Sequence, residues 1–350
     1  MLSKKILSLH HKSIIVDGHA DTFGKILETN GDFFKLGKAV QSHKGWTHLD
    51  FPRMKKGGLD LQFMAIYTPP KYKSADATLY ALKMLTVIKK AVKESNGKII
   101  LIQSAGDLKE LNNKKGFLIN IESGSPLDGN ITLLEMFYRL GVRAMGLTHN
   151  PGNELGDGLC IKNPHGLTTF GKQVVRKMNQ LGMIIDVAHL SKPGFYDVLR
   201  HSNGPIISSH TGVRKLCNVF RNLDDDQIKQ IAERKGVVGI FYIPEFIKSP
   251  TQRFISYQGM KKVKWATILK STTVKDVINH IQYVADKFGV DYVGLGSDFD
   301  GYDGVIKGLE DTTRLPNITA ELANRGFNQT AIKKILGGNF LRVIIQTIHS

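Results

Sequence analysis

The residues best suited to chemistry lie where short apolar runs of the sequence end. The first is the tripeptide His19-Ala20-Asp21, which closes the apolar run 13–18. Side chains two positions apart on a strand point to the same side, so His19 and Asp21 would project together from the strand's end. An imidazole nitrogen beside a carboxylate oxygen suits a divalent metal such as zinc. The pair therefore predicts a metal ligand set at the end of a strand.

The same design recurs along the chain. Later apolar runs end in Glu122, His149, His189 and His210, and the last ends in Asp298 and Asp300. Acids and imidazoles brought together would repel or be poorly solvated unless a cation joined them. The set is larger than the three or four ligands of one ion, which points to two ions bridged by a shared carboxylate. Glu122 is the natural bridge, and the nitrogen-rich ligands favour two Zn²⁺, with Mn²⁺, Co²⁺ or Fe²⁺ as alternatives.

Other polar residues of these segments are given structural roles. We expect Asp17 to cap a turn, with a hydrogen bond to a metal ligand as the alternative. We expect Asp186 to form a buried hydrogen bond and Asp300 to shape the turn that contains it. The remaining histidines lack the strand-end context. We expect them on the surface or in loops: His11, His43, His48, His165, His201, His280 and His349.

Eight short runs with strand character position the candidate ligands. They are 14–16, 61–67, 117–121, 143–147, 183–187, 205–208, 237–242 and 292–296. Several are apolar almost throughout, as parallel strands covered on both faces should be. Segments with apolar residues at helical spacing lie between many of them, at 75–93, 170–181, 224–234 and 274–288.

This alternation predicts an α/β fold, a (β/α)8 TIM-like barrel, with a doubly wound open sheet as the alternative. We prefer the barrel because candidate ligands follow nearly every strand, and a closed barrel brings all its strand ends to one place. Insertions follow the first strand (22–58) and the seventh (244–270), where long loops often form lids or substrate walls. Two helices with a turn near Gly326 are expected at 319–347, and one domain is expected over 1–350.

Composition narrows the class of protein. The 350 residues are 41% hydrophobic, enough for a large core, and no apolar run approaches the roughly 20 residues of a membrane helix. We expect no signal peptide, and the two cysteines, Cys160 and Cys217, are expected to be reduced thiols in the cytoplasm. The net charge of +17 could attract a polyanion. However, the lysines are scattered and are not interleaved with aromatic residues, so we expect a solvated basic surface and no nucleic-acid partner.

At these residues the chain resembles the membrane dipeptidase (renal dipeptidase) family of metallopeptidases. The resemblance extends over 16–343 and rests on nine segments in order: 17–21 (DGHAD), 121–124 (IESG), 147–150 (LTHN), 166–171 (GLTTFG), 186–191 (DVAHLS), 209–210 (SH), 221–222 (RN), 296–301 (GSDFDG) and 338–343 (GNFLRV). So many motifs in the same order make the resemblance specific.

The resemblance implies a ligand set. One zinc ion would be held by His19, Asp21 and Glu122. The other would be held by Glu122, His189 and His210. A hydroxide bridging the ions would then attack the peptide bond.

The resemblance also implies catalytic and substrate-binding residues. Asp298 would act on the bridging water, and His149 would contact the substrate and stabilise the tetrahedral oxygen. Arg221 would hold the terminal carboxylate of the substrate. Small dipeptides, with tolerance for a D-residue at the C-terminal position, would be the substrates, and the protein would be a homodimer. No lipid-anchor signal is evident at 343–350, which favours a cytoplasmic enzyme without a membrane anchor.

Two other functions stay open. Lactonases and phosphotriesterases of the amidohydrolase type generally carry His-x-His on the first strand and a carbamylated lysine as bridge, whereas this chain has His19-Ala20-Asp21 and Glu122. A non-catalytic basic module would instead use the charge of +17 to bind a polyanion in a salt-sensitive way. The complete set of catalytic residues favours the dipeptidase over both.

Overall fold

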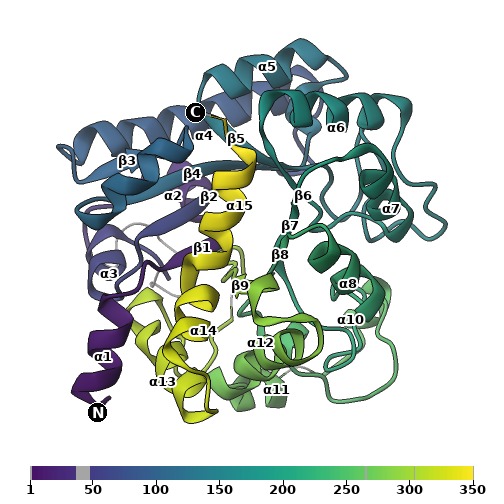
Figure 1. Ribbon diagram of the computed structural model, residues 1–350. Coiled ribbons are helices and arrows are strands. Elements are labelled where there is room, and N and C mark those ends of the chain that lie inside the picture. Colours follow the sequence, from purple (N-terminus) through teal and green to yellow (C-terminus); the bar gives the residue numbers. More distant parts are fainter. Residues whose placement is uncertain (1, 37–47, 265, 303, 350) are drawn as a thin grey trace.

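A computed structural model describes residues 2–36, 48–264, 266–302 and 304–349. Within these residues, all paired strands belong to one parallel sheet (Figure 1). The strands are β1 (Val16–Ala20), β2 (Leu61–Tyr67), β3 (Ile99–Leu101), β4 (Lys115–Glu122), β5 (Val142–Gly146), β6 (Ile184–Asp186), β7 (Ile206–Thr211), β8 (Val237–Ile240) and β9 (Val293–Leu295). Eight of them close a barrel, because β2 pairs with β4, the order runs on to β9, and β9 pairs with β1.

Helices surround the barrel (Figure 1). They are α1 (Lys4–His11), α2 (Thr22–Thr29), α3 (Phe51–Lys56), α4 (Ala75–Glu94), α5 (Ile131–Arg139), α6 (Thr169–Leu181), α7 (Lys192–His201), α8 (Asp225–Glu233), α9 (Pro244–Ile247), α10 (Tyr257–Met260), α11 (Ala266–Ser271), α12 (Val274–Phe288), α13 (Pro316–Asn324), α14 (Gln329–Lys333) and α15 (Asn339–Thr347). None of the helices in the described part of the chain has the length and apolar character needed to span a bilayer.

Local sequence explains where the helices begin and end. Helix α6 begins where the Thr168 side chain accepts a hydrogen bond from the backbone N–H of Gly171, and it ends at Gly182, whose φ of 69° is left-handed. Val174, Val175 and Met178 form its buried face. Helix α6 thus covers the sheet with one apolar stripe.

Helix α15 closes the barrel at the end where the strands begin. It contacts β1, β6, β8 and β9, and its Phe340 ring lies 5.4 Å from that of Phe63. Gly18 and Gly294 make room for this ring, since a Cβ at either position would lie 2.7 Å from a Phe340 carbon. The opposite end of the barrel remains for the site.

The structure confirms the barrel and all eight predicted strands. Strand β3 was not predicted; it pairs with β4 at Lys115–Phe117 and takes no part in closing the barrel. The insertion at 22–58 contains α2 and α3, and its residues 37–47 lie outside the described part. The insertion at 244–270 contains α9, α10 and most of α11. The two helices expected at 319–347 are α13 and a longer unit in which α14 continues through a π-helical turn (Lys334–Gly338) into α15.

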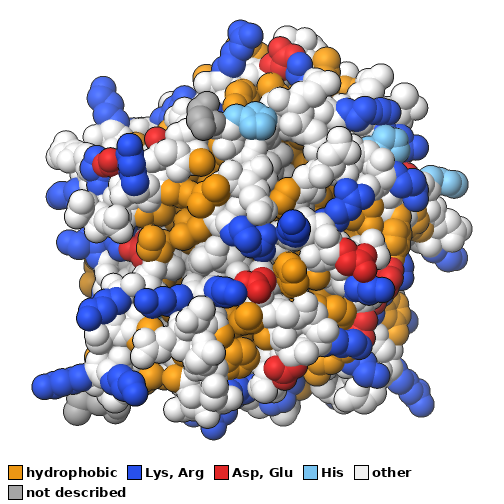
Figure 2. Space-filling view, viewed as in Figure 1, with side chains coloured by type: hydrophobic (Ala, Val, Ile, Leu, Met, Phe, Trp, Pro, Cys, Tyr) orange, Lys and Arg blue, Asp and Glu red, His pale blue; other side chains and the backbone are white. Residues whose placement is uncertain are grey.

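The basic residues do not gather on the face that Figure 2 displays. Lysine and arginine side chains are spread across it among acidic and hydrophobic side chains. This distribution agrees with a solvated basic surface.

Candidate active site

The candidate residues meet at the end of the barrel where the strands end. His19 lies in β1 and is followed by Asp21, Glu122 ends β4, and His210 lies in β7. The loops after β5, β6, β7 and β9 supply His149, His189, Arg221 and Asp298, respectively. A cavity of about 720 Å³ opens onto this group, within the range of small-molecule sites.

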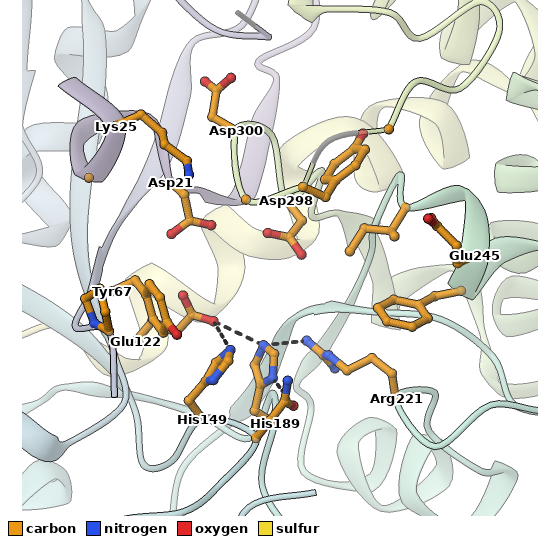
Figure 3. A pocket seen from close by; sticks show the side chains of 18 of the residues that line it. Asp21, Lys25, Tyr67, Glu122, His149, His189, Arg221, Glu245, Asp298 and Asp300 are labelled. Carbon is orange, nitrogen blue, oxygen red and sulfur yellow. Dashed lines mark hydrogen bonds and ion pairs between the residues drawn. The ribbon is translucent and has the colours of Figure 1, made fainter. Parts of the chain in front are cut away.

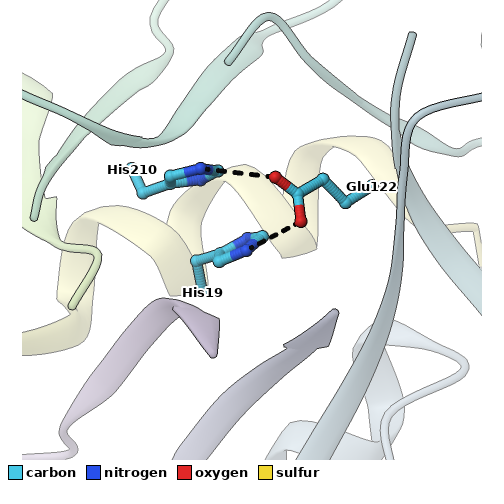
Figure 4. Close-up of side chains that lie close together, drawn as sticks. All are labelled: His19, Glu122 and His210. Atoms are coloured by element: carbon cyan, nitrogen blue, oxygen red, sulfur yellow. Dashed lines mark ion pairs between the residues drawn. The ribbon is translucent and has the colours of Figure 1, made fainter. Parts of the chain in front are cut away.

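Glu122 lies at the centre of the group (Figures 3 and 4). Its Oε2 atom is 3.4 Å from Nε2 of His19. Its Oε1 atom faces three other imidazoles, with Nε2 of His189 at 3.1 Å, that of His210 at 3.7 Å and that of His149 at 3.9 Å. The two oxygens of one carboxylate thus face separate sets of nitrogen atoms.

Two further carboxylates complete the site on the side of His19. Nε2 of His19 is 3.4 Å from Oδ2 of Asp21 and 3.9 Å from Oδ1 of Asp298. Figure 3 shows Asp21 and Asp298 pointing into the same space as Glu122. The resulting cluster has the nitrogen and oxygen donors that zinc-like ions take.

The donor atoms fit a metal better than they fit one another. Three sets of three ligand atoms each lie within 4.8 Å of one another: His19, Glu122 and His210; Glu122, His149 and His189; and His19, Asp21 and Asp298. Both ring nitrogens of His19 and Oδ1 of Asp21 are buried without a hydrogen-bond partner. Buried polar atoms are rarely left unpaired, so these atoms are well placed to coordinate a cation.

The charges of the site lead to the same conclusion. Burial raises the pKa of Asp298 to about 8, and the neighbouring Asp21 and Glu122 carboxylates also raise it, although His19 opposes them. Burial lowers the pKa of His19, but the Glu122 and Asp21 carboxylates outweigh burial and hold that pKa well above its usual value. Protonated His19 thus balances part of the negative charge of Glu122 and Asp21. A bound divalent ion would balance the same charge.

Neighbouring side chains prepare two of the histidines for coordination. Nδ1 of His189 lies 2.8 Å from Oδ1 of Asn150, an acceptor, so Nδ1 carries the proton and the lone pair of Nε2 points into the site, toward Nη2 of Arg221 and Nε2 of His210. Nδ1 of His210 lies 2.8 Å from Oγ of Ser209. Burial lowers the pKa of both imidazoles well below the usual value, which keeps them in the neutral form that binds metals.

Three of the aspartates accept hydrogen bonds that hold the site's segments together. Asp186 does so as expected, whereas Asp17 and Asp300, which were expected to cap or shape their own turns, join segments far apart in the chain. Oδ1 of Asp186 accepts from the backbone N–H groups of Ala188 and Ser209, at 3.0 and 2.9 Å, and so joins the ends of β6 and β7. Asp17 accepts from the N–H groups of His19 and Ser297. Asp300 accepts from Oγ1 of Thr22 at 2.6 Å and from the N–H of His48 at 2.9 Å.

Strained backbone marks the turns that carry the site. Ser123, His189, Asp298 and Asp300 have φ values of 77°, 63°, 60° and 65°. Left-handed conformation is unusual for residues other than glycine, and it costs of order 1 kcal/mol or more for each residue. The surrounding hydrogen bonds thus stabilise turns that aim these side chains into the site.

Arg221 is buried beside the histidines, with an exposed fraction of 3%. Its Nη2 donates to the backbone carbonyl of His210 at 2.8 Å and lies 3.0 Å from Nε2 of His189. Burial lowers its pKa to about 10, so it stays cationic at neutral pH. The guanidinium also lies over the Phe241 ring, 5.6 Å from its centroid.

The sequence-based expectation for His280 was wrong. His280 is 1% exposed on α12 and bridges the Val213 N–H and the Ile247 carbonyl. His48 is in a loop, as expected, but it is buried against Asp300, and His43 lies outside the described residues.

Several residues of the cavity wall were not predicted from the sequence. They are Lys25, Tyr67, Glu245, Phe246 and Tyr302. Lys25, Glu245 and Phe246 fall in the two insertions, which were expected to form substrate walls, but no motif distinguished these side chains.

Comparisons with known proteins agree with this geometry. The family model described as membrane dipeptidase (peptidase family M19) matches residues 3–349. Dipeptidase aclJ of Aspergillus oryzae is 30% identical over 86% of this chain and 70% of its own length, and dipeptidase tcpJ of Claviceps purpurea is 28% identical over 85% and 68%.

Among solved structures, a metallo peptidase from Rhodobacter sphaeroides, liganded with a phosphinate mimic of L-Ala-D-Ala, is 24% identical with a TM-score of 0.83 and covers 96% of this chain and 100% of its own. A dipeptidase of family M19, "dipeptidase AC", is 25% identical with a TM-score of 0.83. The match covers 97% of this chain and 99% of that chain. Because the family model spans nearly the whole chain, the protein belongs to the membrane dipeptidase family, peptidase family M19, and is a metallopeptidase enzyme.

Proposed function

We propose that the protein hydrolyses the peptide bond of small dipeptides with the help of two metal ions, of which zinc is the first choice. The position of Glu122 carries the proposal, because its two oxygens face separate imidazoles at 3.4 and 3.1 Å. A carboxylate in that position can give one oxygen to each ion. Mn²⁺, Co²⁺ or Fe²⁺ could bind the same donors.

The ligand sets follow the family resemblance. His19, Asp21 and Glu122 would hold one ion, and Glu122, His189 and His210 the other. The clustering of ligand atoms offers an alternative for the second set, since it groups His149 with Glu122 and His189. Measurement of metal content in variants separates these possibilities.

When bound, the two ions supply a hydroxide nucleophile near neutral pH and polarise the carbonyl of the scissile bond. Asp298, 3.9 Å from the His19 nitrogen, would take the proton of the attacking water and return it to the leaving amine. His149 would donate a hydrogen bond to the oxygen that becomes negative in the transition state. Arg221 would pair with the terminal carboxylate through Nε and Nη1, for which no hydrogen bond is formed within the described residues.

The finer properties also remain proposals. The family resemblance supports tolerance for a D-residue at the C-terminal position and a homodimer. The free thiols of Cys160 and Cys217 support a reducing, cytoplasmic location. One domain is proposed for residues 1–350.

Elemental analysis beside a dipeptide assay tests the proposal. We expect two ions per chain and hydrolysis of L-Ala-L-Ala and L-Ala-D-Ala after loading with zinc or manganese. A protein that hydrolyses lactones or phosphotriesters but no dipeptide would instead belong to the alternative reaction class. Salt-sensitive binding of nucleic acid without turnover would identify the basic binding module.

A further inference from the structure

The carboxylate of Glu245 lies on the cavity wall without a partner. Glu245 is half-buried at the start of α9 and lines the same cavity as Glu122 and Arg221. Apart from its own backbone N–H, no donor or cation among the described residues reaches its side chain. Burial raises its pKa, so the ionised form is poorly solvated there. A cation from a ligand would relieve that penalty.

Packing places Glu245 at the end of the cavity where Arg221 lies. The side chain of Asn222, next to Arg221, donates to the Phe246 carbonyl at 2.8 Å. The Phe246 ring lies 5.5 Å from that of Phe241, which in turn lies under the Arg221 guanidinium. Figure 3 shows Glu245 and Arg221 on one wall, across the cavity from Lys25 and Tyr67.

Tyr302 and several apolar side chains complete this end of the cavity. The Tyr302 hydroxyl is buried without a hydrogen-bond partner. Burial raises its pKa most, and the carboxylates of Asp298, Asp300 and Glu245, in that order, raise it further. Apolar residues line the cavity as well: Ile243, Phe246, Met260 and Leu269. Such a lining suits the methylene stem of a lysine-like side chain. The charged end of that side chain would then reach the Glu245 carboxylate and the Tyr302 hydroxyl.

We propose that Glu245 and Tyr302 form a specificity site for a long cationic side chain on the C-terminal residue of the dipeptide, as in lysine, ornithine or arginine. This inference rests on the proposed function, because Arg221 would bind the terminal carboxylate and so place the side chain of that same residue beside Glu245. The ammonium or guanidinium group pairs with the Glu245 carboxylate, and the Tyr302 hydroxyl supplies a further oxygen acceptor.

Paired substrates of equal length test the site. In the metal-loaded enzyme, we expect kcat/KM for Ala-Lys to exceed that for Ala-norleucine by at least about tenfold, the range of a hydrogen bond to a charged group. Glu245→Gln should bring that ratio close to one, and Glu245→Lys should favour Ala-Glu over Ala-Lys. Tyr302→Phe should lower the ratio by a smaller factor. Glu28→Gln, the same change at another residue of the cavity wall, should leave the ratio unchanged.

Two outcomes would overturn the inference. A wild-type ratio near one would show that the cationic side chain is not recognised. If Glu245→Gln lowered kcat/KM for Ala-Lys and for Ala-norleucine by the same factor, the Glu245 carboxylate would bind the α-ammonium group common to all dipeptides.

Calorimetric binding of free lysine and norleucine gives a readout that needs no turnover. Preference for lysine that disappears in Glu245→Gln supports the site even if no dipeptide is hydrolysed, in which case only the proposed function fails. Hydrolysis of both dipeptides at equal rates, with equal binding of the two amino acids, removes the specificity site and leaves the proposed function intact.

Discussion

At the scale of single residues, Glu122 connects the two halves of the site. The Glu122→Gln variant keeps the shape of the side chain and removes its charge, so one carboxylate can no longer serve two cations. We expect the metal content to fall to one ion per chain or fewer, as measured by elemental analysis, with loss of turnover. Glu154→Gln, which makes the same change at an exposed position, should keep both ions. Two ions retained in Glu122→Gln would contradict the bridging role.

Asp298 is expected to move a proton, not to hold the metals. For Asp298→Asn we predict two ions per chain and a fall in kcat of about 10²–10⁴-fold, because an amide cannot accept the proton of the attacking water. Asp286→Asn, on the exposed side of α12, serves as the control. Near-normal turnover of Asp298→Asn would remove this residue from the mechanism.

His149 allows the two ligand assignments to be distinguished. If it donates to the developing oxyanion, His149→Ala should lower kcat by about 10²–10³-fold while the metal content stays at two ions. We expect both ions to be kept, because the family resemblance gives His149 a role in contacting the substrate. The alternative is that His149 is a metal ligand, since its Nε2 lies 3.9 Å from Oε1 of Glu122. Loss of an ion in this variant would make His149 a ligand and refute the substrate-contact role.

At the scale of elements, α15 stabilises the barrel from the end opposite the site. Phe340 is fully buried between strands, whereas Ile345 on the same helix is 60% exposed. Phe340→Ala should therefore reduce the free energy of unfolding by about 3–5 kcal/mol, and Ile345→Ala should change it by less than about 0.5 kcal/mol. Urea denaturation of both variants measures the difference, and equal effects would show that α15 is not packed as described.

At the scale of the whole molecule, His280 couples stability to pH through the contacts between α12, α9 and the loop after β7. Burial lowers its pKa from 6.5 to about 4, so the folded protein holds it neutral while the unfolded chain is protonated below pH 6.5. The stabilisation from this group is complete above pH 6.5 and is lost as the pH falls toward 4, by up to about 3 kcal/mol.

Comparison with the His280→Asn variant isolates this contribution. The difference in free energy of unfolding between wild type and variant, measured from pH 7 to pH 4 at one metal concentration, should shrink as the pH falls. If the free energies of unfolding of wild type and His280→Asn changed with pH in parallel, the prediction would be contradicted. Other histidines titrate equally in both proteins and cancel in the difference.

The barrel, and a group of acids and imidazoles gathered at one of its ends, could be predicted from the sequence. Short runs that are apolar almost throughout, and acids or histidines at their ends, are local features, so they can be read without knowing which strands are neighbours. That is why all eight strands of the barrel were predicted, together with His19, Asp21, Glu122, His149, His189, His210 and Asp298 as residues that meet.

The surroundings of those residues could not be predicted from the sequence, because they depend on how distant loops pack together. The burial of Arg221 and His280, the Asn150 contact that sets the His189 tautomer, and the unpartnered Glu245 all arise where loops from different strands meet. Short strand β3 also escaped prediction, because its three residues carry too little periodicity to separate it from a loop. Local patterns show which face of an element is buried, but they do not show which distant side chains will lie against it. That physical difference separates the predicted cluster of acids and imidazoles from the cavity wall around it.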